Sequence, residues 1–300
     1  MSQEYEIDER QRIVDEIVSC MATGQEHKDV QRIQTEHRLK LVKFWGIQPG
    51  DTVLEIGCGQ GDTTAVLAWA TGSDGLVHGI DVATRDYGSP ITVGDSANYL
   101  LDSKLGAPIQ MDYEVDVLSF DTHFPEDAFD YVVISHASWY MASFEELRQI
   151  LERVRHWGKR LCFAEWDTRI EHIQQFPHLL AVLIQAKYEC FKENSTANIR
   201  TLFTVDDIHR VAAEAGWTIE REQSIESVQL QDGQWETDMV LNTYEDELDA
   251  LFDVPDKLRS LIESEVRMLE HSVQQTDVIG SMATYVFVAS RAETFKSGGL

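Results

Sequence analysis

The chain has 300 residues, 43% of them hydrophobic, so it can bury a substantial core as one large domain or as a core domain with a cap. Its formal net charge of −27 disfavours nucleic acid and anionic membranes as partners, because both attract clustered lysine and arginine. The first residues are acidic, and no stretch reaches the roughly 18 uninterrupted apolar residues of a membrane span, which argues against a signal peptide and a membrane protein.

Two helical patterns open the chain. Ile13, Ile17 and Met21 recur at helical spacing and form a first apolar stripe. A second stripe follows and consists of Val30, Ile33, His37, Leu41 and Phe44. The glycines and proline at positions 46–50 then end the helix. We expect residues 1–48 to form N-terminal helices that belong to a cap.

From residue 49 onward, short apolar runs alternate with helical segments. Strands are expected at residues 52–56, 76–80, 109–115, 131–135, 160–164, 217–219 and 284–289. Helices are expected at residues 62–69, 96–105, 144–154 and 205–215, the second of them capped by Asp95. This alternation predicts an α/β fold with a doubly wound, mostly parallel seven-stranded sheet over residues 49–290.

Two stretches exceed what such a sheet needs. One is an apolar helix at residues 176–191, and the other runs from 232 to 275 with Pro255 inside it. We expect these insertions, near 170–200 and 232–280, to form a helical cap over the carboxyl edge of the sheet together with the N-terminal helices. The alternative is that all of them cover the outer faces of the sheet. Residues 291–300 are expected to form a flexible tail.

The turn after the first expected strand is the most informative segment. Gly57, Gly59 and Gly61 stand at alternate positions between that strand and the next helix. Glycine adopts backbone angles closed to other residues and lets a ligand approach the main chain, and a helix start offers unpaired N–H groups. Asp81 ends the second strand, where a carboxylate can accept hydrogen bonds from both hydroxyls of a ribose. These features indicate a site for a nucleoside-type cofactor.

The spacing of the glycines distinguishes between cofactors. Dinucleotide-binding proteins usually show Gly-x-Gly-x-x-Gly, whereas here the third glycine is already at position 61. The segment resembles the first motif of class I S-adenosylmethionine-dependent methyltransferases, in which an acidic residue, here Glu55, precedes Gly-x-Gly-x-Gly. The resemblance spans roughly residues 49–290 and continues in the segments 79–82, 128–133 and 204–217.

The resemblance implies a Rossmann-like enzyme that uses S-adenosylmethionine and releases S-adenosylhomocysteine, with no metal. The cofactor-binding residues that it implies are Glu55, Gly57, Cys58, Gly59, Gly61, Asp81, Val82, Asp116, Val117 and Ser135. Asp81 would hold the ribose, Val82 would lie against the adenine, and Asp116 would accept from the adenine amino group. Because the loop 84–93 is longer than is usual in the family, Asp116 is also open to interpretation as a surface carboxylate.

Candidates for the acceptor side follow the fourth and fifth expected strands. His136 is the candidate general base, since histidine titrates in the useful pH range. Trp139 and Tyr140 are candidates for stacking on a planar or cationic substrate. Glu165 is the candidate for binding a substrate amine, and Trp166 is the candidate for a further aromatic wall of the substrate site. A histidine bonded to a backbone carbonyl, and aromatic rings that only pack in the core, are the alternatives.

The expected acceptor is a small molecule. Aromatic side chains beside acids favour an amine or nitrogen heterocycle, while a phenol or carboxylate oxygen remains the main alternative and a carbon nucleophile stays open. A nicotinamide-dependent oxidoreductase and a non-catalytic cofactor-binding subunit are the rival classes. The four cysteines, at positions 20, 58, 162 and 190, show no zinc or disulfide spacing, so we expect a cytoplasmic protein. We expect it to be either a monomer or a homodimer.

Overall fold

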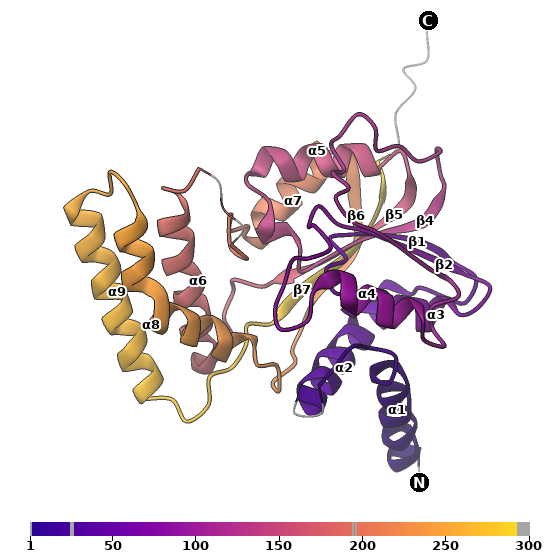
Figure 1. Cartoon of the computed structure of the whole chain (residues 1–300), viewed down its shortest axis with the longest axis horizontal. Helices are drawn as coiled ribbons and strands as arrows, with labels where there is room; N and C mark the ends of the chain where they lie inside the picture. The colour runs from indigo at the N-terminus through magenta and orange to yellow at the C-terminus, as the bar shows by residue number, and fades with distance from the viewer. Residues whose placement is uncertain (1, 25–26, 194, 196, 293–300) are drawn as a thin grey trace, which may run out of the picture.

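The computed structural model describes residues 2–24, 27–193, 195 and 197–292. One sheet organises them, with strand order β3-β2-β1-β4-β5-β7-β6 (Figure 1). The strands are β1 Thr52–Ile56, β2 Leu76–Ile80, β3 Ile109–Asp112, β4 Phe129–Ser135, β5 Gly158–Trp166, β6 Trp217–Ile225 and β7 Thr284–Arg291. β7 runs antiparallel to both of its neighbours, whereas the other pairings are parallel. The predicted mostly parallel, seven-stranded α/β sheet is confirmed.

Helices cover both faces of this sheet. α5 (Phe144–Val154) and α7 (Val205–Glu214) share one apolar core with β4 and β5. α3 (Asp62–Thr71) and α4 (Val93–Leu101) share the core of the opposite face. The central strand β4 is apolar on both sides because it is covered on both, and Val132, Val133 and Ile134 are fully buried.

The cap expected at Asp95 is wrong. α4 begins at Val93, and its N-cap is Thr92, whose hydroxyl accepts the N–H of Asp95 at 3.0 Å. Threonine can cap from the extended conformation that precedes a helix, so the helix starts three residues before the expected position. Asp95 instead lies in the first turn, where its negative charge favours the helix dipole.

The N-terminal helices α1 (Ser2–Val18) and α2 (Lys28–Trp45) lie against the face that carries α3. Leu41, Val42 and Trp45 of α2 are buried in the core they share with α3 and β1. The C-terminal half of α2 therefore covers a sheet face. Residues at its centre reach the carboxyl edge of the parallel strands, as described below.

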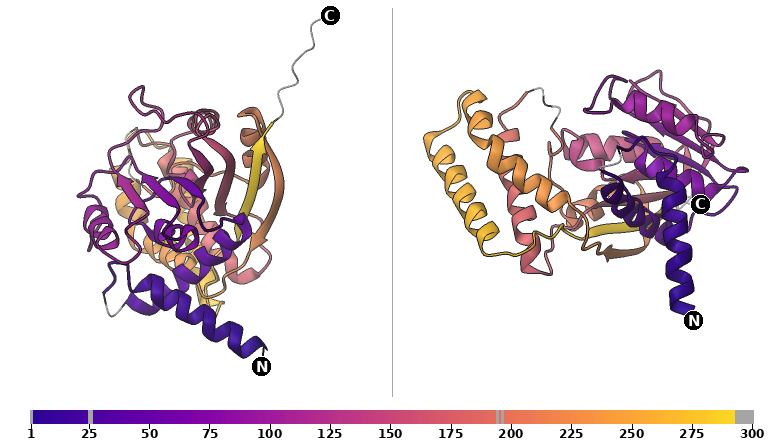
Figure 2. Two further views of the ribbon diagram at one scale, coloured as in Figure 1. Left: turned by 90° about the vertical axis from the view of Figure 1, so that its right-hand side faces the viewer. Right: turned by 60° about the horizontal axis from the view of Figure 1, so that its bottom comes forward.

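The remaining long helices form a three-helix unit. α6 (Phe176–Glu189) lies between β5 and α7 in the sequence, and α8 (Asp232–Ala250) and α9 (Asp256–Gln274) lie between β6 and β7. Figure 2 shows these three helices set to one side of the sheet. They bury a core of their own, made by Leu180, Ala181, Ile184, Tyr188, Val240, Leu248, Ile262, Val266 and Leu269. Lys187 of α6 also pairs with Glu265 of α9 at 2.7 Å.

Two expectations concern the chain ends and membranes. Of the tail expected at 291–300, Arg291 is the last residue of β7, and the part after Ala292 lies outside the described residues. Within the described part of the chain, no helix has both the length and the apolar character needed to cross a bilayer.

Candidate active site

The three glycines after β1 all adopt left-handed backbone conformations, with φ of 77° at Gly57, 50° at Gly59 and 90° at Gly61. A Cβ on Gly57 would lie 2.7 Å from the Cβ of Ala137, in the loop after β4. By contrast, nothing lies within 4 Å of a Cβ placed on Gly59. The first glycine is thus required by a close approach of two loops, and the second borders open space that a ligand can enter.

Asp81, which follows β2, ties the glycine loop to the next loop. Its Oδ2 accepts the N–H of Gly59 at 2.7 Å, and its Oδ1 accepts the N–H of Ala83 at 2.8 Å. Each carboxylate oxygen keeps a further lone pair for a hydroxyl donor. The neighbouring Val82 is 69% exposed, so an apolar surface lies beside the carboxylate, as a nucleoside base requires.

Glu55 lies beneath the glycine loop as a buried acid. Its Oε2 accepts the hydroxyl of Thr64 at 2.6 Å, from the first turn of α3. Burial raises the pKa of Glu55 to about 8, and the Thr64 hydrogen bond opposes this rise. Near neutral pH the ligand-free protein therefore holds much of this carboxyl in its neutral form.

We expect the contribution of Glu55 to the stability of the ligand-free protein to fall as the pH rises from about 5 to 8. Folding raises the pKa of Glu55, so the folded protein favours the protonated carboxyl. Between about pH 5 and 8 the unfolded chain ionises this group while the folded protein keeps it protonated, so the stability that the group contributes falls as the pH rises. Glu55→Gln removes this dependence. Relative to wild type, the variant should gain on the order of a few kcal/mol between pH 5 and 8. Urea unfolding at both pH values measures it, and parallel pH profiles would contradict it.

Helix α2 places a positively charged side chain, that of Arg38, near the buried carboxyl of Glu55 and the start of α3. Arg38 donates from Nη1 to the Gln34 side chain at 2.7 Å, and its Nη2 lies 3.6 Å from Oδ2 of Asp62, the first residue of α3. The Nε of Arg38 is buried without a hydrogen-bond partner among the described residues. The sequence alone does not single out Arg38, because nothing in its local pattern separates it from other arginines on a helix surface.

The other expected cofactor residues lie in different environments. Cys58 is buried below the loop, and burial raises the pKa of its thiol. Ser135, at the end of β4, is buried with its Oγ unpartnered among the described residues. Val117 is part of the core between β4 and α5. Asp116 is exposed, and its Oδ1 accepts the N–H of Leu118 at 2.7 Å, so it closes its own turn at the surface.

His136 follows β4 at the same edge of the sheet, held by a bond from its N–H to the carbonyl of Ala164 at 2.8 Å. Its Nδ1 is buried and lies 3.5 Å from Oε1 of Glu165, without a hydrogen bond. Its Nε2 lies 3.4 Å from Nε2 of His37 on α2. Among the described residues, neither ring nitrogen is bonded to a backbone carbonyl, and His37 joins the site although sequence analysis placed it only in an apolar stripe.

Glu165, at the end of β5, is engaged by the protein itself. Its Oε2 accepts the N–H and the hydroxyl of Ser138, at 3.1 and 2.7 Å, and the N–H of Trp139 at 3.4 Å. These bonds fix the short helix η2 (Ser138–Tyr140). The carboxylate thereby positions the loop after β4. A substrate amine, which we expected to bind Glu165, would compete with these protein groups for the carboxylate.

The expected aromatic wall divides into two. The ring of Trp139 is buried in the core beside α5, which removes it from the substrate side. Trp166 lies between two imidazoles, with ring centroids 4.6 Å from His136 and 5.1 Å from His178. Tyr140 is 44% exposed, yet desolvation raises the pKa of its phenol. Part of the Tyr140 side chain is therefore accessible to a small molecule at the carboxyl edge of the sheet.

The groups that act electrostatically on Tyr140 are mostly acidic. Tyr87, Glu236, Glu165 and Asp81 all raise the pKa of its phenol further. Glu236 belongs to α8 and accepts the side-chain amide of Gln185 on α6 at 2.6 Å. The acidic groups that act on Tyr140 therefore come both from the carboxyl edge of the sheet and from the three-helix unit.

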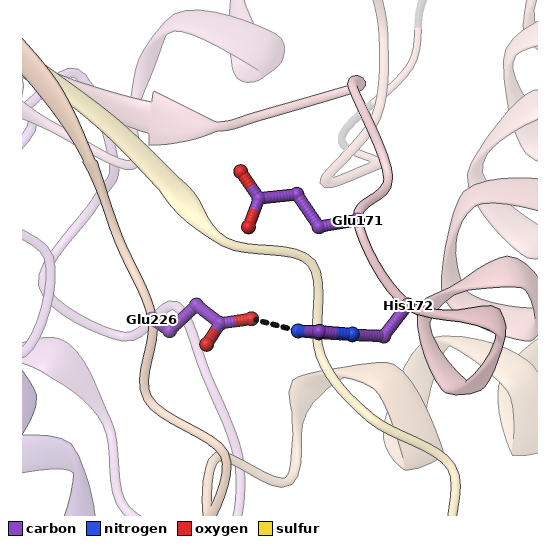
Figure 3. A group of neighbouring side chains, drawn as sticks. All are labelled: Glu171, His172 and Glu226. Carbon is purple, nitrogen blue, oxygen red and sulfur yellow. Dashed lines mark ion pairs between the residues drawn. The ribbon is translucent and has the colours of Figure 1, made fainter.

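One group of side chains in the described part of the chain has metal-ligand character. Glu171, His172 and Glu226 place one ligand atom each within 4.8 Å of one another, and all three are exposed (Figure 3). Figure 3 shows an ion pair between Nε2 of His172 and Oε1 of Glu226, which are 3.1 Å apart. The pair joins the segment that leaves β5 to the segment that leaves β6, so it ties together two of the connections to the three-helix unit.

Comparisons with known proteins agree with this geometry. Residues 27–222 match the family model described as a methyltransferase domain. A cyclopropane-fatty-acyl-phospholipid synthase-like protein from Lactobacillus casei is 32% identical, with a TM-score of 0.80 over 93% of this chain and 99% of the other. Methyltransferase phomM' from Diaporthe leptostromiformis is 27% identical over 207 residues, which are 57% of this chain and 54% of that protein.

A 2-phytyl-1,4-naphtoquinone methyltransferase from Synechococcus elongatus is 32% identical over 133 residues, 43% of this chain and 53% of that protein. The chain thus spans about half the length of these two curated relatives. The family match covers more than half of the chain and includes α2, the glycine loop, Asp81 and His136. The chain belongs to the class I S-adenosylmethionine-dependent methyltransferases.

Proposed function

We propose that this methyltransferase acts on the nitrogen of a small amine or nitrogen heterocycle. The observation that supports this most is the sign of the charges around Tyr140. The acids Glu236, Glu165 and Asp81 all act on its phenol, and Asp232 acts on Glu236 in the same sense. A cationic amine would offset the negative charge of these carboxyl groups and could contact the faces of Tyr140 and Trp166.

The residues of the cofactor side fit the nucleoside and the amino acid of S-adenosylmethionine. We assign the ribose hydroxyls to Asp81 and the adenine to the exposed face of Val82. Arg38, with its unpartnered Nε, would take the carboxylate, since guanidinium groups bind carboxylates in pairs of hydrogen bonds. When bound, the cofactor supplies a methyl group on a positively charged sulfur.

His136 would remove the proton of the acceptor nitrogen. Its buried Nδ1 faces the carboxylate of Glu165, which stabilises the imidazolium that forms. We expect His136→Ala to lower kcat by about 100-fold, with the affinity for S-adenosylmethionine unchanged. Single-turnover kinetics and calorimetry measure the two quantities. An unchanged kcat for an amine acceptor would show that no base acts from this position.

A panel of acceptors tests the proposal itself. Amines and nitrogen heterocycles, phenols, carboxylic acids and naphthoquinones are each incubated with enzyme and cofactor, and S-adenosylhomocysteine is measured. We expect turnover with the amines and a weaker response in Glu236→Gln. Turnover of phenols or of naphthoquinone carbon, with amines no faster than the buffer control, would reject an amine acceptor.

A further inference from the structure

We propose that Gln34 of α2 is a positioning residue that joins the cofactor side of the active site to the start of α8, so that bound cofactor orders the helix that carries Glu236. The inference rests on one part of the proposed function, the assignment of the cofactor carboxylate to Arg38. It adds a residue that acts through its two neighbours, Arg38 and Asp232, and it does not depend on which acceptor the enzyme uses.

Gln34 lies between two charged side chains. Nη1 of Arg38 donates to the side-chain oxygen of Gln34 at 2.7 Å and to its backbone carbonyl at 3.2 Å. Nε2 of Gln34 donates to Oδ2 of Asp232, the first residue of α8, at 2.8 Å. A row of hydrogen bonds therefore runs from the guanidinium group through one amide to a carboxylate that lies 198 residues further along the chain.

The charges at the two ends leave the Gln34 amide one orientation. A guanidinium group offers only donors, and an ionised carboxylate offers only acceptors. The oxygen of the amide must therefore face Arg38 and its NH₂ group must face Asp232, because a flipped amide would bring donors together at one end and acceptors together at the other. Glutamine fits this position because it carries both an acceptor and a donor.

At the Arg38 end, Gln34 leaves one edge of the guanidinium group for the cofactor. Gln34 takes Nη1, whereas Nη2 lies 3.6 Å from the carboxylate of Asp62 and Nε is buried without a hydrogen-bond partner among the described residues. Nε and Nη2 can together bind a carboxylate through two parallel hydrogen bonds. A carboxylate at this edge fixes the plane of the guanidinium group, and thereby the direction of the bond from Nη1 to Gln34.

At the α8 end, Asp232 is one of the acids of the acceptor side. It lies one helical turn before Glu236. Burial raises the pKa of Glu236, and the charge of Asp232 raises it further. Glu236 is in turn one of the acids that act on Tyr140. The hydrogen bond from Gln34 therefore holds the first turn of the helix on which the acidic surroundings of Tyr140 depend.

Other contacts of α2 hold the segment before α8 without Gln34. The ammonium group of Lys40 donates to the backbone carbonyl of Glu226 at 3.1 Å and to the hydroxyl of Ser227 at 2.9 Å. Loss of the Gln34 bond should therefore loosen the first turn of α8 and leave the preceding segment in place. Variants at position 34 are expected to stay folded for the same reason.

Hydrogen exchange measured by mass spectrometry tests the inference with S-adenosylhomocysteine as the only ligand. At saturating ligand, we expect the amides of residues 233–240 in the wild type to exchange about 5-fold more slowly than in the free protein. Gln34→Leu should bind the ligand with less than about 10-fold loss of affinity and show no slowing at 233–240. Gln31→Leu is the matched control and should keep the slowing, because Gln31, one turn earlier on α2, bonds to Asp62 at 3.0 Å.

A reversed pair of side chains distinguishes the hydrogen bond from packing. Gln34→Glu still accepts from Arg38 but turns a second carboxylate toward Asp232, so the slowing at 233–240 should be lost. Combining Gln34→Glu with Asp232→Asn keeps the net charge and reverses the bond, since the new amide at 232 donates to the new carboxylate at 34. We expect the double variant to recover most of the slowing.

The outcomes separate this inference from the assignments on which it rests. Slowing that persists in Gln34→Leu, slowing that is absent in the wild type although the ligand binds, or a double variant that behaves like Gln34→Glu alone would each overturn it. Arg38→Leu tests the carboxylate assignment and should weaken binding of S-adenosylhomocysteine by about 30-fold. Unchanged affinity in that variant would reject the assignment made for the cofactor itself, whichever acceptor the enzyme methylates.

Discussion

Gly57→Ala is expected to abolish binding of S-adenosylmethionine. The added Cβ meets two obstacles, because φ at this position is 77° and the Cβ of Ala137 lies 2.7 Å from its place. The left-handed backbone alone costs about 1 kcal/mol, and the contact with Ala137 forces the glycine loop away from the loop that carries His136. Calorimetry with S-adenosylhomocysteine should detect no heat, while circular dichroism still shows a folded protein.

Two further variants separate strain from the contact. Gly72→Ala also adds a Cβ at a positive φ, 65°, but with nothing within 4 Å of that Cβ, and it lies at the far end of α3. It should lose about 1–3 kcal/mol of stability and keep full affinity. Gly57→Ala combined with Ala137→Gly relieves the contact and should recover part of the affinity. Equal affinity of Gly57→Ala and wild type would show that the glycine loop is not the cofactor site.

Asp81→Asn is expected to weaken cofactor affinity by about 1,000-fold. The carboxylate accepts from the N–H groups of Gly59 and Ala83 and has lone pairs left for two hydroxyls. An amide turns an NH₂ group toward one of these donors, so the variant loses the charged acceptor and disturbs both loops. Titration with S-adenosylhomocysteine gives the dissociation constants of variant and wild type.

Asp116→Asn provides the comparison for Asp81. Its carboxylate is exposed and accepts the N–H of Leu118 in its own turn, so we expect a loss of less than about 10-fold. A loss as large as that of Asp81→Asn would restore the adenine contact that family resemblance implies for Asp116. No loss in Asp81→Asn would contradict the ribose assignment.

The sequence predicted best those strands whose own residues form a distinct local pattern. β1 and β2 coincide with their expected bounds, because each is a short apolar run between turn residues. β6 was expected at 217–219 but continues to Ile225, through residues that are mostly exposed. Pairing with β7 extends this edge strand, and polar residues on an edge leave no apolar period to detect.

In the candidate site, too, some residues were predictable from the local sequence and others were not. The glycines and Asp81 were predictable, since both follow strands directly and glycine spacing is a local signal. Arg38 and His37 were not identified as site residues, and neither was Tyr113, which supports the glycine loop. Tyr113 donates to the carbonyl of Gly59 at 2.8 Å across 54 residues, and His37 meets His136 across 99. Such contacts depend on how helices and strands are stacked, which no periodicity reports.

Two neighbouring aromatic residues also show that the local sequence does not determine which side chain faces the site. Trp139 and Tyr140 are consecutive aromatics, and the sequence offered both as candidates for the substrate side, with core packing as the alternative. The bonds from Ser138 and Trp139 to Glu165 set the rotation of η2, so the ring of Trp139 enters the core while Tyr140 stays exposed. A turn held by a carboxylate 27 residues away decides which aromatic is available.

The position of β7 between β5 and β6 has a consequence for biosynthesis. A ribosome makes β6 first, then α8 and α9, and only then the strand that pairs with both β5 and β6. Until that strand emerges, the nascent chain carries two unpaired strand edges, the kind of surface that chaperones shield from aggregation. Thr284, its first residue, pairs with Trp166 and contacts His37. Closing the sheet and completing the acceptor site are therefore one late folding event, so partly synthesised chains should be inactive even where the cofactor loop has already formed.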